Sequence, residues 1–80
     1  MLDGADTHFG DRIRSRRKAL GMTLADLAAI ANLRFRQLHK YERGVHRISA
    51  GVLYRLAVAL EVDVGYFFEG LAPLASPRLN

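Results

Sequence analysis

Cationic side chains gather in one short stretch of this 80-residue sequence, between residues 34 and 47. Five positions of the stretch carry a full positive charge: Arg34, Arg36, Lys40, Arg43 and Arg47. Glu42 is the one acid among them. An arginine guanidinium can donate two parallel hydrogen bonds to a phosphate or a nucleobase edge, and lysine adds a compact point charge. The pattern indicates recognition of a polyanion, with a solvated helix face as the alternative.

A second basic block lies at residues 12–18 and contains no acid. Its five cations are Arg12, Arg14, Arg16, Arg17 and Lys18. Each block therefore holds five of the twelve bases, whereas residues 1–11 contain three acids and no base. Because the net charge is a modest +4, the argument for a polyanionic partner rests on this clustering and not on the total.

Other kinds of chemistry find little support in the sequence. The absence of cysteine excludes disulfides, thiolate metal sites and thiol catalysis. The three histidines, His8, His39 and His46, do not have the spacing of a metal site on one helix face. Neither a nucleophile motif nor a glycine-rich phosphate loop occurs. We therefore expect no enzyme activity, no metal and no cofactor.

Size and hydropathy bound the remaining possibilities. Eighty residues, half of them hydrophobic, are enough for one small domain. No apolar run approaches the roughly 18 residues that a membrane span needs, and the N-terminal segment is acidic and has no apolar signal-peptide core. The expectation is a cytoplasmic protein without a membrane partner.

Apolar residues at helical spacing predict an all-α fold, and no strand pattern is present. Five helices are expected, at about residues 7–21, 23–31, 34–42, 50–61 and 64–69. Thr23 and Asp26 have the form of a capping box at the start of the second helix. Asn32 tolerates the left-handed conformation that ends it, and Ser49 is a plausible N-cap for the fourth.

The second and third helices are separated by a tight turn at Asn32 and Leu33. The second helix is small and apolar, and the third carries most of the cationic donors of residues 34–47. A short helix rich in donors and braced by an apolar one has the shape and charge to enter a DNA major groove. The arrangement indicates a helix-turn-helix.

Four segments, in order and at matching spacing, resemble one known family. They are R-I-R-S-R-R-K-A-L-G-M-T (12–23), L-A (27–28), Y-E-R-G (41–44) and L-A-V-A-L-E-V-D-V-G-Y-F-F (56–68). The chain resembles the Cro/repressor-type helix-turn-helix domain of the Xre family over about residues 9–70. The resemblance implies a compact, lambda-repressor-like bundle of five helices. Residues 1–8 are expected as a flexible N-terminal arm, and residues 71–80 as an extended or disordered tail.

The resemblance also implies a function, a regulator of transcription that binds an inverted repeat in double-stranded DNA as a homodimer. It would be associated with the nucleoid when bound. Carried over by position, four residues would face the base edges: Arg34, Phe35, Arg36 and Lys40. An arginine fork suits guanine O6 and N7, and a phenylalanine can rest against a thymine methyl group.

A second set of residues is expected at the phosphodiester backbone. Thr23, Arg43 and Arg47 match family positions that hold it, and Gln37 and His39 lie at the sides of the same helix. Backbone contacts fix the register on DNA and give an affinity that depends on salt.

Two further expectations concern the scaffold and the dimer. Arg17 and Glu42 are expected to form an ion pair that ties the first helix to the end of the third, with Arg17 also near the backbone. The last helix is implied to carry the dimer contact. Its candidate residues are Tyr66, Phe67, Phe68 and Leu71, of which one or two aromatic rings should pack inward.

The sequence departs from the family pattern at two positions. Leu24 stands where a glutamine usually donates to phosphate, and Arg34 takes the N-cap position of the third helix, which is usually serine or threonine. Ile30 is expected to point outward. Leu24, Ile30 and the C-terminal aromatic residues could instead form a docking surface. The alternative function is therefore a protein-interaction module, such as an antitoxin or a co-regulator, with a protein partner.

Overall fold

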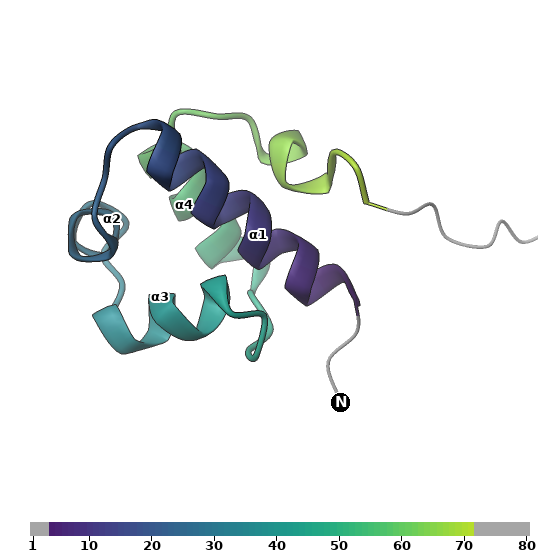
Figure 1. Ribbon diagram of the computed structural model, residues 1–80, viewed down its shortest axis with the longest axis horizontal. Coiled ribbons are helices and arrows are strands. Elements are labelled where there is room, and N and C mark those ends of the chain that lie inside the picture. Colours follow the sequence, from purple (N-terminus) through teal and green to yellow (C-terminus); the bar gives the residue numbers. More distant parts are fainter. Residues whose placement is uncertain (1–3, 72–80) are drawn as a thin grey trace, which may run out of the picture.

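The computed structural model describes residues 4–71 and contains four α-helices followed by one 3-10 helix (Figure 1). The elements are α1 (Gly4–Ala19), α2 (Leu24–Ile30), α3 (Phe35–Glu42), α4 (Ala50–Leu60) and η1 (Val64–Phe68). The expected all-α fold is confirmed, but the fifth element is not an α-helix. Its five residues include Gly65, and so short a segment is better closed by the tighter i to i+3 bonds of a 3-10 turn. None of these helices has the length and apolar character that crossing a membrane requires.

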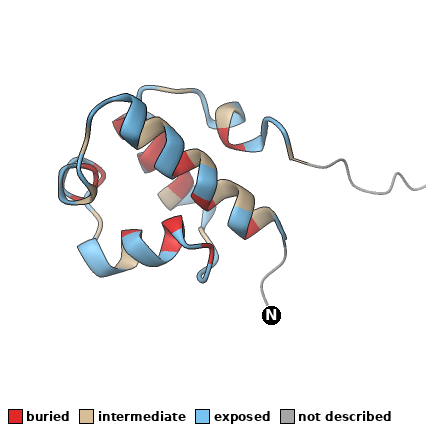
Figure 2. Ribbon diagram, viewed as in Figure 1, coloured by how far each residue is buried: buried red, intermediate tan, exposed pale blue. Residues whose placement is uncertain are grey.

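The core is built from side chains that come from every element (Figure 2). Its largest fully buried side chains are Ile13 of α1, Leu27 of α2, Leu38 of α3, Leu56 and Leu60 of α4, and Phe67 of η1. Burying side chains of this size stabilises a fold by roughly 1.5–3 kcal/mol each. The position of α3 is therefore fixed by a core that all five elements share.

The turn between α2 and α3 follows the local signals in the sequence. The Thr23 hydroxyl accepts a hydrogen bond from the Asp26 amide at 3.0 Å, and the Asp26 carboxylate accepts one from the Thr23 amide at 2.9 Å. This reciprocal pair is the predicted capping box. Asn32, with φ of 57°, is in the left-handed conformation expected of it. α2 therefore has a defined start and end, which sets the angle at which the chain enters α3.

α1 begins at Gly4, three residues before the predicted start, so residues 4–8 are helical and not a flexible arm. Its first turns lie directly on the end of α3. A Cβ atom at Gly10 would be 2.4 Å from the Tyr41 carbonyl oxygen, and one at Gly44 would be 2.8 Å from the Thr7 Cα atom. Contacts made by backbone and glycine leave no hydrophobic periodicity, which is why the sequence pattern missed this part of α1. Residues 1–3, and the expected tail beyond Leu71, lie outside the described residues.

Candidate nucleic-acid interface

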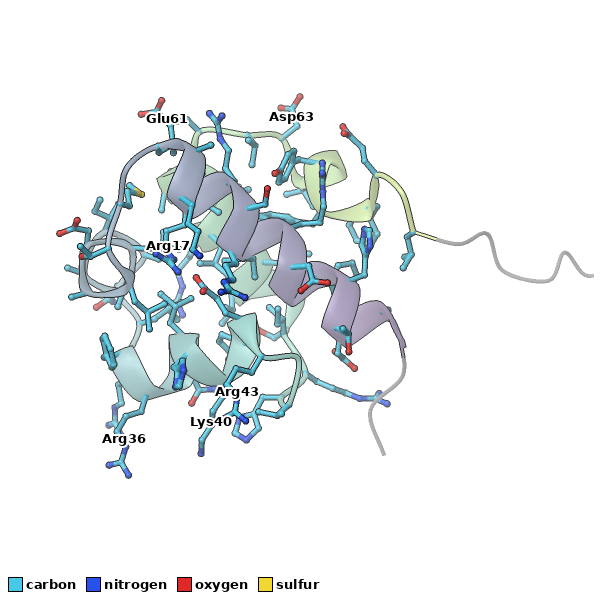
Figure 3. All side chains as sticks on the ribbon, in the orientation of Figure 1. Arg17, Arg36, Lys40, Arg43, Glu61 and Asp63 are labelled. Carbon is cyan, nitrogen blue, oxygen red and sulfur yellow. The ribbon has the colours of Figure 1, made fainter. Side chains whose placement is uncertain are left out.

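One side of α3 is buried and the other carries the cations. Leu38, Tyr41 and Glu42 face inward. The four residues predicted to face base edges, Arg34, Phe35, Arg36 and Lys40, are all exposed. Figure 3 shows Arg36, Lys40 and Arg43 pointing away from the body of the molecule from the same side of α3. Because these three lie four and three positions apart, they form one ridge along the helix.

Two of the acids lie far from this ridge. Glu61 and Asp63, between α4 and η1, project from the side of the molecule opposite the α3 ridge (Figure 3). An anion that approaches α3 therefore meets a basic ridge whose nearest acid, Glu42, is buried and already paired. This separation of charge favours one orientation of the protein toward a polyanion.

Glu42 is paired with Arg17, as the sequence predicted. Arg17 Nε donates to Glu42 Oε2 at 2.6 Å, and Arg17 Nη2 donates to Glu42 Oε1 at 2.9 Å. Arg17 Nη1 also donates to the Met22 carbonyl oxygen at 2.9 Å. The hydrogen bond to Glu42 raises the pKa of Arg17 above its ordinary value, so the guanidinium stays charged. These three bonds join α1, the α1–α2 turn and the end of α3, which makes Arg17 part of the scaffold.

The other internal arginines of α1 were not predicted from the sequence. Arg12 Nε donates to the Tyr66 carbonyl oxygen at 2.9 Å, and its guanidinium carbon lies 3.7 Å from the centre of the Tyr66 ring. Arg16 Nε donates to the Leu60 carbonyl oxygen at 2.9 Å. Backbone carbonyls carry no sequence signature, so the basic block at residues 12–18 resembled a polyanion surface. Three of its five cations instead hold the fold together, which leaves Arg14 and Lys18 exposed.

Leu24 does not stand out as an exposed apolar residue. It is half-buried and packs against the core at the start of α2. There it lines a hollow of about 310 Å³ together with Arg14, Arg17, His39, Glu42 and Arg43. Leu24 thus packs against the core and is surrounded by basic side chains, and its place at a DNA surface stays a prediction.

The other residues expected at the DNA backbone differ in how they are held. Thr23 uses its hydroxyl oxygen as the α2 cap, and Gln37 Nε2 donates to the Tyr41 hydroxyl at 2.7 Å. Arg47 is exposed, and its Nε lies 3.9 Å from Oδ2 of the buried Asp6. The sequence did not point to Asp6, because it lies in the part of α1 that was expected to be a flexible arm.

The expected dimer residues do not form one exposed surface. Phe67 is fully buried in the core, so it is excluded from a contact between two copies. Tyr66 is half-buried beneath Arg12. Phe68 is exposed, and its ring packs edge to face on the Phe9 ring with 5.0 Å between the ring centres. Leu71 is half-buried. Short 3-10 geometry places adjacent aromatic residues on different sides, so one turns inward and the next outward.

Metal chemistry has no centre in the described part of the chain. Within residues 4–71, no three side chains of histidine, aspartate or glutamate come together as a group that could hold an ion.

Known proteins share this arrangement. A family model described as Helix-turn-helix matches residues 13–67. A curated relative from Rhodospirillum rubrum, an uncharacterized transcriptional regulator in the ATPase CF(0) region, is 48% identical over 66 residues. The match covers 82% of this chain but 61% of that relative, so the chain spans less than two thirds of its length.

Two solved structures have a similar fold. The restriction-modification controller protein C.AhdI from Aeromonas hydrophila is 30% identical, with a TM-score of 0.77, and the match covers 79% of this chain and 96% of that one. The master regulator for biofilm formation SinR, solved in complex with DNA, is 29% identical, with a TM-score of 0.73. The match covers 76% of this chain and 98% of that one.

Proposed function

The chain belongs to the Xre-type helix-turn-helix family, and on this premise we propose that it is a regulator of transcription that reads a specific sequence in double-stranded DNA. The observation that carries the proposal is the exposed cationic ridge of α3, fixed from behind by the Arg17–Glu42 pair. The solved complex of SinR with DNA supports it, since that protein shares the fold.

In the proposed complex, α3 enters the major groove with its first turn toward the bases. Arg34 and Arg36 offer guanidinium forks for guanine, Phe35 offers an apolar surface for a thymine methyl group, and Lys40 follows one turn later. Arg43, Arg47 and His39 lie where they can reach the phosphates. Base contacts select the site, and phosphate contacts fix the register and supply the affinity that salt weakens.

We further propose that the protein binds as a homodimer on an inverted repeat. Domains of this size gain stability and specificity when two copies bind adjacent half-sites. The half-sites would then lie about 34–36 Å apart, one turn of B-DNA. This places the two α3 helices in successive major grooves on the same side of the duplex.

A protein-interaction module is the second candidate. The observation that favours it is Ile30, which is 58% exposed at the end of α2. A docking surface would not require the cationic ridge of α3, however, and a regulator can also bind a protein partner. The DNA-binding proposal therefore accounts for more of the surface.

The proposal is tested first by selecting bound duplexes from a random DNA library. An enriched inverted repeat is the expected result, since it would require both base readout and two bound copies. Recovery of no motif by a folded protein would contradict sequence-specific binding. An enriched single half-site would instead leave base readout standing and contradict the homodimer.

Substitutions then separate the two classes of contact. We expect Arg36→Ala to weaken binding of the selected site by about 1–3 kcal/mol and to relax the preference at one base pair. We expect Arg47→Ala to weaken the binding of all duplexes alike. It should also reduce the slope of log affinity against log salt concentration by about one. Fluorescence anisotropy on the selected and a scrambled duplex measures both. The same response from both variants would refute the division into base and backbone contacts.

A further inference from the structure

The hollow that Leu24 lines opens between α1, α2 and the end of α3, beside the cationic ridge. Its volume is about 310 Å³. One water takes up about 30 Å³ of liquid, so the hollow has room for a phosphate group together with ordered water. Arg43 belongs both to the lining of the hollow and to the ridge of α3 (Figure 3). A duplex that lies along the ridge would therefore bring its sugar-phosphate backbone to the hollow.

The fixed charges that line the hollow come from α1 and from the end of α3. Arg17 and Glu42 are the buried pair, and their opposite charges largely cancel. Arg14 and Arg43 are both exposed, and neither side chain has a hydrogen-bond or ion-pair partner among residues 4–71. α2 contributes Leu24, which carries no charge. The hollow therefore has a surplus of two positive charges, which favours an anion.

His39 is the residue of this lining whose charge can change near neutral pH. It is exposed, and its ring has no hydrogen-bond or ion-pair partner in the described part of the chain. It lies four positions before Arg43, the C-cap residue of α3, so the two side chains share one side of the helix. Arg36, three positions before His39, adds a further exposed cation on that side. Histidine ordinarily changes its charge between pH 5 and 8, and only its protonated ring donates hydrogen bonds from both nitrogens.

We propose that His39 binds a DNA phosphate at this hollow in its protonated form, so that DNA binding takes up a proton. The inference rests on the proposed DNA-binding function and adds a role for Arg14, which supplies a charge from the side of α1 that a lysine would also supply. A phosphodiester placed among Arg14, His39 and Arg43 stabilises the charged imidazole relative to the neutral one. Affinity must then rise as the pH falls, because the complex holds more protons than the free protein and DNA.

The test compares affinities at two pH values and constant ionic strength. The wild type should bind both the selected and a scrambled duplex about threefold or more tightly at pH 6 than at pH 8, and by less than tenfold per pH unit for each protomer, because one group takes up at most one proton. His39→Gln should keep the wild-type affinity of pH 8 at both values, and His39→Lys should stay near that of pH 6. His46→Gln replaces an exposed histidine outside the hollow and should retain the wild-type pH dependence.

A matched pair of substitutions in α1 tests whether the phosphate lies at the hollow. Arg14→Gln should weaken the binding of every duplex about threefold or more and reduce the slope of log affinity against log salt concentration by about one. Lys18→Gln removes an exposed cation of the same helix that does not line the hollow, and it should change affinity by less than about twofold. Equal effects of the two variants would overturn the hollow as the phosphate site. Circular dichroism at pH 6 and pH 8 verifies that every variant is folded, as expected for exposed positions.

Calorimetry of DNA binding in two buffers with different ionisation enthalpies counts the protons directly. The expected result is an uptake by the wild type that is absent in His39→Gln. Equal wild-type affinities at pH 6 and pH 8, or a pH dependence that survives in His39→Gln, would overturn the inference and leave DNA binding standing. Loss of the pH dependence in His46→Gln alone would overturn it as well, by assigning the proton to the loop after α3. A folded wild-type protein that binds no duplex at either pH would overturn the DNA-binding proposal itself.

Discussion

At the scale of single residues, the carboxylate of Glu42 ties the end of α3 to α1. It is buried, and both of its oxygens accept hydrogen bonds from Arg17. A buried ion pair gains little over an apolar contact, but losing one partner leaves the other charge buried and uncompensated. The pair therefore makes the orientation of α3 dependent on α1.

We expect Glu42→Ala to lower the free energy of unfolding by about 3 kcal/mol and to weaken DNA binding as well, because Arg17 would be left without its partner. Thermal unfolding and anisotropy on the selected duplex measure the two effects. Glu69→Ala is the control, since its ion pair with Arg12 is exposed and should contribute about 0–1 kcal/mol. Equal melting temperatures for the wild type and Glu42→Ala would contradict a structural role for the pair.

The capping box makes stability depend on pH. The hydrogen bond from the Thr23 backbone amide, and to a smaller extent the Thr23 side chain, lower the pKa of Asp26 below its ordinary value. A group with a lowered folded-state pKa stabilises the protein above its unfolded-state pKa, about 3.9 for aspartate, and loses that contribution as the pH falls through the folded-state value. Asp26→Asn should therefore melt below the wild type near neutral pH, and the difference should shrink in acid. A difference in melting temperature that does not change with pH would show that the ionised carboxylate is not the stabilising form.

At the scale of the elements, the sequence predicted what local signals encode. Thr23, Asp26, Asn32 and Ser49 marked helix ends because capping and left-handed residues act within a few positions of themselves. The sequence pattern missed the first turns of α1, which pack against the end of α3 through glycine and backbone contacts at Gly10 and Thr7.

The sequence likewise predicted only part of the candidate interface. The exposed side of α3 followed from charge and periodicity, and the Arg17–Glu42 pair followed from the family pattern. The internal bonds of Arg12 and Arg16 end on carbonyl oxygens of η1 and α4, which any residue type could supply. Long-range contacts to the backbone are invisible in a single sequence.

The close packing of α1 on α3 can be tested by substituting Gly10, with Gly51 of α4 as the control position. Gly10→Ala should lower the free energy of unfolding by about 1–3 kcal/mol, because its Cβ atom would lie 2.4 Å from the Tyr41 carbonyl oxygen and the helices would have to separate. Gly51→Ala adds the same methyl group to α4, where nothing lies within 4 Å, and should raise stability by about 0.5–1 kcal/mol. Chemical denaturation compares the two. Similar effects at both positions would contradict close packing at Gly10.

At the scale of the whole molecule, the cationic ridge of α3 and two acids, Glu61 and Asp63, lie at opposite ends (Figure 3). The cations that remain free for DNA are fewer than the sequence suggests, because three of those in α1 bond internally. A count of the cations in the two basic blocks therefore overstates the number that would contact DNA phosphates.

This division predicts a moderate salt dependence of DNA binding. The five cations at positions 34–47 would give a slope of log affinity against log salt of at most about −4 to −5 per bound protomer, a value reached if the cations that face the bases also neutralise phosphates. The cations of both blocks together would give about −9. Anisotropy titrations on the selected duplex at several salt concentrations measure the slope. A slope near about −9 would show that the arginines of α1 leave their internal partners when DNA binds.

The internal arginines of α1 also restrict how the sequence can drift over generations. Exchange of arginine for lysine preserves net charge and is usually counted as conservative. A lysine at position 17, however, could not span both Glu42 oxygens and the Met22 carbonyl, because its ammonium is a single point at the end of a flexible stem. Lineages whose genomes favour lysine codons should therefore keep arginine at this position, while Arg14 and Lys18, which stay in solvent, are free to interchange.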